Sequence, residues 1–206
     1  MKKSLRVMAV AAAATTVALI PAAAQAVPLD VDYDAVGTAT IASTGSTIDL
    51  GPTTLSTTVD SEGGPGSLTG TLPLDPTTVE FKAAGFLPVK ATVSFEEAAP
   101  ITGQLVRDGA LTRVESTASY FIKLSDVKVA GLPAFVGNNC QTEDPVQIPA
   151  NTPAGGNFNI VAGGSLEGEF SIGDFERCGL TTGIINLLVP GDGNTVQLDV
   201  SNGRLG

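Results

Sequence analysis

The chain contains no histidine and no tryptophan, and it has only two tyrosines and two cysteines. Without an imidazole, the sequence excludes hydrolases that use a histidine base, metalloprotease helices and three-histidine zinc sites. The scarcity of tryptophan and tyrosine leaves few aromatic platforms that could stack on sugars or nucleobases, although eight phenylalanines can supply apolar walls. Composition alone therefore excludes most common secreted hydrolases.

The N-terminal segment has the three parts of a cleaved secretory signal. Three basic residues within the first six positions precede an apolar run over 7–20, and a small-x-small pattern follows at 24–26. We therefore predict a signal peptide over 1–26. The alternative, a membrane anchor, is disfavoured because a bilayer span needs about 20 apolar residues. The end of the chain has neither an apolar tail nor a basic stop, so we expect no membrane anchor in the mature chain.

Export would make the protein more acidic. Of the 11 basic residues three lie in the predicted signal, which leaves 11 − 3 = 8 against 21 acidic residues, a net charge of 8 − 21 = −13. Phosphate backbones and anionic bilayers repel such a chain, whose few cations are scattered along the sequence. We expect an acidic protein that is secreted, extracellular or in the cell envelope, with no nucleic-acid partner.

Both cysteines, Cys140 and Cys178, lie in the part of the chain that would be exported. An even count in a non-reducing compartment predicts a disulfide. A redox or zinc pair is disfavoured because the two are 178 − 140 = 38 residues apart and no histidine or third cysteine is present. In the chain-entropy model, a bridge of this span stabilises the fold by roughly 4 kcal/mol.

Composition and periodicity predict an all-β fold. Glycine and proline punctuate the mature chain, and apolar residues alternate with polar ones over 89–96 and 196–201, as in half-buried antiparallel strands. The mature chain shows no apolar repeat at helical spacing over three turns. We therefore predict an antiparallel β-sandwich, immunoglobulin-like or jelly-roll-like, with about a dozen short strands and one disulfide.

The clearest local element is a hairpin over 183–201, in which the apolar run 184–189 meets a second strand across a turn rich in glycine and asparagine. Segments 60–66 and 138–157 are rich in Gly, Pro, Asn and Asp and are expected to be loops. The other expected strands cover 30–42, 54–59, 67–73, 78–82, 102–106, 116–123, 127–129, 158–161 and 166–172.

We expect a single domain over 27–206, with a soft division near 104–112 as the alternative. A weak internal repeat, Gly-Ser-Leu-x-Gly at 66–70 and again at 164–168, suggests a duplication of half-domains as an alternative. The flanking residues do not keep register, so one domain is the preferred interpretation.

Asp30, Asp32 and Asp34 alternate on one face of a predicted strand and form a weak calcium candidate, because calcium prefers hard oxygen ligands. The glycine and the distal glutamate of a helical calcium loop are absent. An acidic, solvent-facing edge strand is the simpler interpretation. We predict no cofactor and no metal site beyond this candidate.

Two carboxylate pairs are candidates for catalytic groups. Glu167 and Glu169 share a strand face, whereas the adjacent Glu96 and Glu97 point opposite ways. A glycosidase needs two carboxylates about 5 to 9 Å apart across a cleft. Neither pair has that opposition or an aromatic sugar subsite, so we assign no catalytic residue and predict a non-enzymatic protein, with a carboxylate glycosidase as the residual alternative.

Four blocks of the sequence combine turn and strand patterns. They are GSLTGTLPL at 66–74, GFLPVKATV at 85–93, VAGLP at 129–133 followed by VGNNC at 136–140, and GGSLEG at 163–168 followed by CG at 178–179. Together they resemble uncharacterised secreted two-cysteine β-rich proteins of high-GC Gram-positive bacteria, of the actinobacterial type. The resemblance spans most of the mature chain and implies an extracellular β-domain, with no catalytic or ligand residue to carry over.

The leading hypothesis is an exported, non-enzymatic envelope or extracellular β-sandwich with a structural, adhesive or ligand-binding role. Its expected partners are a cell-envelope component or an apolar small molecule. The second hypothesis is a carrier that holds a lipid or other apolar ligand between the sheets, and the third is an oligomeric envelope porin, which the sequence disfavours because it shows no clear apolar belt. A continuous apolar cavity above about 300 Å³ would favour carriage, and a fully packed interior would favour a scaffold. The phenylalanines that could line such a cavity are Phe81, Phe86, Phe95, Phe121 and Phe158.

Overall fold

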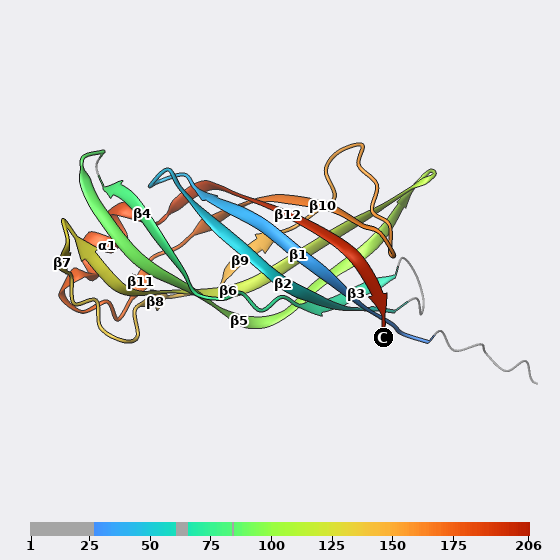
Figure 1. Cartoon of the computed structure of the whole chain (residues 1–206), viewed down its shortest axis with the longest axis horizontal. Helices are drawn as coiled ribbons and strands as arrows, with labels where there is room; N and C mark the ends of the chain where they lie inside the picture. Colours follow the sequence, from blue (N-terminus) through green and yellow to red (C-terminus); the bar gives the residue numbers. More distant parts are fainter. Residues whose placement is uncertain (1–26, 61–65, 84) are drawn as a thin grey trace, which may run out of the picture.

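The computed structural model describes residues 27–60, 66–83 and 85–206, so the predicted signal peptide and the middle of the predicted loop 60–66 lie outside the described residues. Within these ranges the chain is mostly β-strand, with one 3-10 helix and one short α-helix (Figure 1). The predicted antiparallel all-β fold is confirmed. The elements are β1 (Leu29–Ile41), β2 (Ser46–Asp60), β3 (Ser67–Thr71), β4 (Thr77–Ala83), β5 (Leu87–Asp108), β6 (Leu111–Val129), β7 (Leu132–Pro133), β8 (Gln141–Thr142), β9 (Val146–Pro149), β10 (Gly163–Ile172), β11 (Phe175–Glu176), η1 (Gly179–Thr181), α1 (Thr182–Leu188) and β12 (Gly191–Leu205).

All twelve strands belong to one hydrogen-bonded sheet, in the order β10-β12-β1-β2-β3-β5-β6-β8-β11, with β4 beside β5 and with β7 and β9 beside β6. Just after β9, Asn151 forms an antiparallel bridge with Glu167 of β10. There the N–H groups of Asn151 and Glu167 each donate to the other residue's carbonyl oxygen, both at 2.8 Å. The sheet therefore curls until its two sides meet. The two layers expected of a sandwich are parts of this one continuous sheet (Figure 1).

Five strands, β1, β2, β5, β6 and β12, have 13 to 22 residues and are longer than the short strands that the sequence predicts. Their alternation is as predicted. Val89, Ala91 and Val93 of β5 are buried, and so are Val196, Leu198 and Val200 of β12, while the residues between them reach the outer face. The long strands thus turn apolar side chains inward and polar ones outward along the length of the molecule.

The predicted strand over 184–189 is wrong, because this run forms α1. A short continuous apolar run does not distinguish a strand from a buried helical turn by its pattern alone. In the helix, Ile185 faces the core and Ile184 and Leu187 are exposed. Asn186 fixes the helix to β11, since its Oδ1 accepts the N–H of Phe175 at 2.7 Å and its Nδ2 donates to the Phe175 carbonyl at 3.0 Å.

Two further expectations are corrected. Segment 158–161 is a turn rather than a strand, joined by paired hydrogen bonds between Asn159 and Gly163, and it places Phe158 in the core. The predicted loop 138–157 contains β8 and β9, which pair with β6. Residues 104–112, where the alternative domain division was placed, form the end of the long β5–β6 hairpin.

The predicted disulfide between Cys140 and Cys178 is present, and both residues are fully buried. It joins the loop before β8 to the start of η1 and so holds the base of α1 against the sheet. Near the same end, the buried Asn194 accepts the N–H of Ala42 at 3.0 Å and donates to the carbonyls of Phe170 and Gly191. Its amide thereby connects the β1–β2 turn to β10 and β12.

The closure of the sheet depends on a glycine. A Cβ at Gly168 would lie 1.8 Å from the carbonyl oxygen of Pro149, whereas a Cβ at Gly173 would meet nothing within 4 Å. We expect Gly168→Ala to lower the free energy of unfolding by about 1 to 3 kcal/mol, because the β9 and β10 backbones must separate. Gly173→Ala is the matched control. Equal urea midpoints for the two variants would contradict this account of the closure.

The disulfide should contribute strongly to stability. Replacing both Cys140 and Cys178 by alanine is expected to lower the free energy of unfolding by about 4 kcal/mol, since the bridge restricts the unfolded chain. Dithiothreitol should lower the melting temperature of the parent protein and leave the double variant unchanged. An unaltered melting temperature in the double variant would show that packing alone holds α1 in place.

Candidate functional site

A continuous apolar cavity of about 280 Å³ runs inside the curled sheet. Inward-facing residues of all the long strands, of β4 and β10, and of α1 line it. No lining residue carries a charge or an amide side chain. The cavity thus follows from the alternation of the long strands, which is interrupted by β-bulges but leaves no charged side chain in the lining.

The cavity is elongated because it passes through two packed clusters. One cluster lies at the α1 end and includes Ile185 and Phe175, and the other lies toward Phe158. Leu74, Phe95 and Ile148 pack against both clusters and mark where they join. Residues 89 and 105 of β5 both line the cavity. Because 16 residues of strand extend at most about 50 Å, this value is the upper limit on the distance between these two lining residues.

Every hydroxyl group that lines the cavity is already hydrogen-bonded within the protein. Tyr120 donates to the Leu72 carbonyl at 2.7 Å, and Tyr33 donates to the Ile160 carbonyl at 2.6 Å. The other lining hydroxyls, those of Thr44, Ser46, Thr57, Ser116 and Thr181, bond to each other or to backbone carbonyls. The cavity therefore offers an occupant apolar contact and no free polar partner.

Three of the five phenylalanines proposed for the cavity, Phe81, Phe95 and Phe158, line it. Phe86 instead lies at the exposed turn between β4 and β5. Phe121 lies between two inward-facing residues of β6 and points to the outer face.

Two lining phenylalanines were missed. Phe170 continues the inward alternation of Leu166 on β10 and could have been found from that pattern. Phe175 lies in the two-residue strand β11 and has no periodic signal.

The calcium candidates are on the outer face, as expected, but on a central strand rather than an edge, since β1 lies between β2 and β12. Asp34 accepts hydrogen bonds from Asn202 at 2.9 Å and from Arg204 at 2.7 Å, and these bonds lower the pKa of Asp34. Asp30 accepts one from Thr58, and it lines a shallow polar depression with Asp32. Among the described residues, no three His, Cys, Asp or Glu side chains are grouped to hold a metal ion.

The two carboxylate pairs are separate surface features. Glu167 and Glu169 are exposed on the outer face of β10. Glu96 forms an ion pair with Lys123, and Glu97 accepts the backbone N–H of Leu72 at 2.5 Å. Glu96 thus takes part in a surface ion pair, Glu97 connects β5 to the residue after β3, and none of the four glutamates lines the cavity.

Comparison with known proteins found no matching family model, no matching curated protein and no matching solved structure. In the described part of the chain, no helix has the length and apolar character needed to cross a membrane. The disulfide is compatible with an extracellular location. The site is therefore defined by its own geometry, an apolar cavity inside a disulfide-bonded β-protein.

The two tyrosines give the interior a pH-dependent signal. Burial raises the pKa of Tyr33 above the ordinary value of 10.0, and burial together with the charge of Glu97 raises the pKa of Tyr120. Because folding favours the protonated phenols, their contribution to stability is present below pH 10 and is lost as the pH rises through the higher folded values.

We expect tyrosinate absorbance at 295 nm to appear above pH 10, together with the loss of far-UV circular dichroism. In guanidinium chloride both phenols should titrate near 10. Since the chain has only these two tyrosines and no tryptophan, the single variants Tyr33→Phe and Tyr120→Phe assign the signal. Half-ionisation of either tyrosine at pH 10 in a folded protein would contradict the buried, hydrogen-bonded arrangement.

Proposed function

We propose that this chain is an exported, non-enzymatic protein that binds one slender apolar molecule, such as a fatty acyl chain, inside its curled sheet. The observation that carries the proposal is the continuous cavity whose lining has no charged residue and no unsatisfied hydroxyl. A polar ligand would lose its hydrogen bonds with water there and gain none, whereas an apolar chain loses nothing.

The size of the cavity supports a narrow ligand. At about 280 Å³ it lies just below the value of about 300 Å³ at which ligand pockets begin, and below the size that would by itself favour carriage. An apolar cavity of about 150 Å³ is enough for benzene. Because this space is stretched through both core clusters, it suits a thin hydrocarbon chain rather than a ring system.

The same features weigh against the other classes. A structural scaffold needs no continuous apolar space in its interior, since close packing maximises its stability. A porin would turn apolar residues outward, but the long strands carry polar residues such as Lys90, Glu96 and Asp199 on that face. A glycosidase would need paired carboxylates across a cleft, and the glutamates lie on the outer surface.

Filling the cavity should weaken binding. Ala91 lines the cavity on β5, and Ala99 is exposed on the same strand, so Ala91→Leu and Ala99→Leu make the same chemical change inside and outside. With cis-parinaric acid, a linear fluorescent fatty acid, we expect Ala91→Leu to raise the Kd at least tenfold, about 1.4 kcal/mol. Ala99→Leu should bind like the parent protein.

Two further measurements keep this test decisive. Ala118→Leu fills the cavity from β6 and replaces Ala91→Leu if thermal melting shows that the first variant is unfolded. Native mass spectrometry of protein purified from its own source should show an apolar adduct. A parent protein that carries no adduct and does not bind cis-parinaric acid would exclude a carrier and leave a scaffold or adhesive role.

A further inference from the structure

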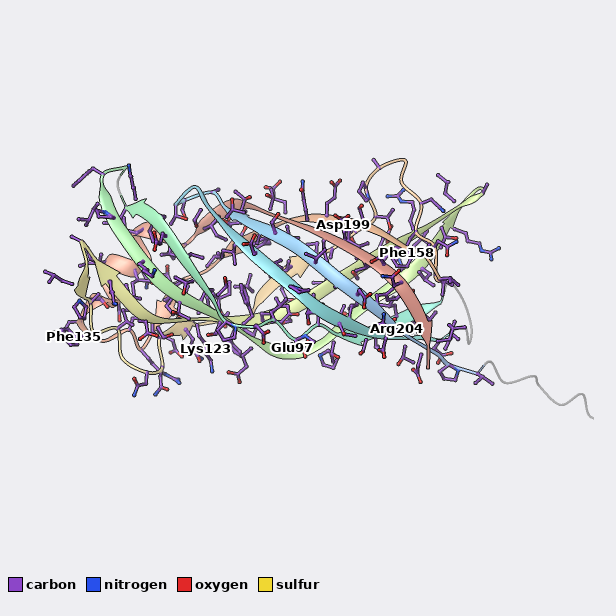
Figure 2. All side chains as sticks on the ribbon, viewed as in Figure 1. Glu97, Lys123, Phe135, Phe158, Asp199 and Arg204 are labelled. Atoms are coloured by element: carbon purple, nitrogen blue, oxygen red, sulfur yellow. A yellow bond between two sulfur atoms is a disulfide. The ribbon has the colours of Figure 1, made fainter. Side chains whose placement is uncertain are left out.

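One end of the elongated molecule exposes a cluster of large apolar side chains. They come from β7 and the residues that follow it, from η1 and α1, and from the β4–β5 turn, all at the same end of the structure (Figure 1). Phe135 is 85% exposed and projects at this end, away from Arg204 at the other (Figure 2). We call this cluster the apolar tip; its members are Phe86, Leu132, Phe135, Leu180, Ile184 and Leu187.

Specific contacts hold the segments of the apolar tip together. The N–H of Ala130 donates to the Pro88 carbonyl at 2.9 Å, which joins the β6–β7 turn to the start of β5. The Cys140–Cys178 disulfide joins the segment after Phe135 to η1. Single exposed apolar residues are ordinary on a soluble protein, but a cluster at one pole marks an interaction surface.

The charge of this end differs from that of the rest of the protein. Segments 80–90, 126–140 and 175–189 hold four of the eight basic residues of the mature chain but only three of its 21 acidic residues. Two of these charge pairs are direct, Lys90 with Glu80 at 2.7 Å and Arg177 with Glu176 at 3.1 Å. These segments are therefore close to neutral, although the adjoining Glu143, Asp144 and Asp174 add three carboxylates nearby. In a mature chain with an expected net charge of −13, this local neutrality suits a partner without strong charge of its own.

The apolar tip also lies next to the cavity. Ile184 lines the cavity and is 60% exposed, and Thr181 and Leu188 line it as well. One helix of seven residues, with no side-chain cap at its start, thus separates the cavity from the apolar tip. At the far end, Tyr33 and Phe158 make an edge-to-face contact that packs the interior.

We propose that the apolar tip docks on a zwitterionic lipid surface and that the apolar ligand passes between this surface and the cavity at α1. The docking part stands on the exposed cluster and its neutral charge, and the transfer part rests on the proposed function. A second copy of this chain is a less suitable occupant because two bodies of net charge −13 repel each other.

A single tryptophan can report the docking, because the chain has none of its own. Leu187→Trp places it on the apolar tip, and Val161→Trp places it at the opposite end, where the Val161 carbonyl accepts the N–H of Gly203. With phosphatidylcholine vesicles, we expect a blue shift of emission for Leu187→Trp and none for Val161→Trp. Equal spectra with and without vesicles for both variants would overturn the docking.

Removal of the exposed side chains tests the same surface without a reporter. The triple variant Phe135→Ser, Leu180→Ser and Leu187→Ser should sediment with phosphatidylcholine vesicles at least tenfold less than the parent, and 1 M NaCl should change neither. Leu205→Ser, an exposed leucine at the far end, is the control. If the parent forms dimers in solution that the triple variant loses, and does not bind vesicles, the apolar tip is an interface between copies and the lipid proposal is wrong.

The two proposals fail separately. The triple variant should still bind cis-parinaric acid added from ethanol, but should take it up from phosphatidylcholine vesicles at least tenfold more slowly than the parent. Ala91→Leu should bind vesicles like the parent and take up little ligand. In the parent protein, binding to vesicles without binding of cis-parinaric acid refutes the cavity function alone, and binding of cis-parinaric acid without binding to vesicles refutes the docking alone.

Discussion

The structure depends on the meeting of β9 and β10, where two hydrogen bonds between Asn151 and Glu167 bring the two sides of one sheet together. The close approach of Gly168 to Pro149 permits this contact. Without it, the sheet would be an open ribbon with one apolar face in water, which is costly in proportion to the area exposed. With it, that face becomes an interior, and the long strands can alternate apolar and polar residues on either side of their β-bulges.

The interior that results is apolar but not completely filled. Its hydroxyl groups are satisfied by the backbone, and its charges are all on the outer face, paired in places as in Lys90 with Glu80, which lowers the pKa of Glu80. Stability and the proposed ligand binding would therefore use the same residues. A carrier of the proposed kind would need no constellation of catalytic or metal-binding groups.

Much of the fold was readable from local pattern, whereas the site was not. The alternation in β5 and β12 is a local signal for strands, and the even cysteine count is enough to predict the disulfide. Both the strands and the disulfide were confirmed. The run at 184–189 was ambiguous because a continuous apolar segment fits either a strand or a helix, and tertiary contacts through Asn186 decide for the helix. The closure at Asn151 was not predicted, because Asn151 lies in a segment expected to be a loop and its partner Glu167 belongs to a separate strand. The cavity was beyond any local pattern, because its volume depends on how all inward side chains pack together.

The pairing of β1 with β12 has a consequence for how the protein is made. These are the first and last strands of the described residues, yet they are neighbours along nearly their full length. A chain that is synthesised from its N-terminus must hold β1 and β2 with one side unpaired until the final residues are available, and contacts of such long sequence separation form slowly. During that interval β1 presents a free edge able to pair with other chains, so loss of the last strand would leave the protein prone to aggregate.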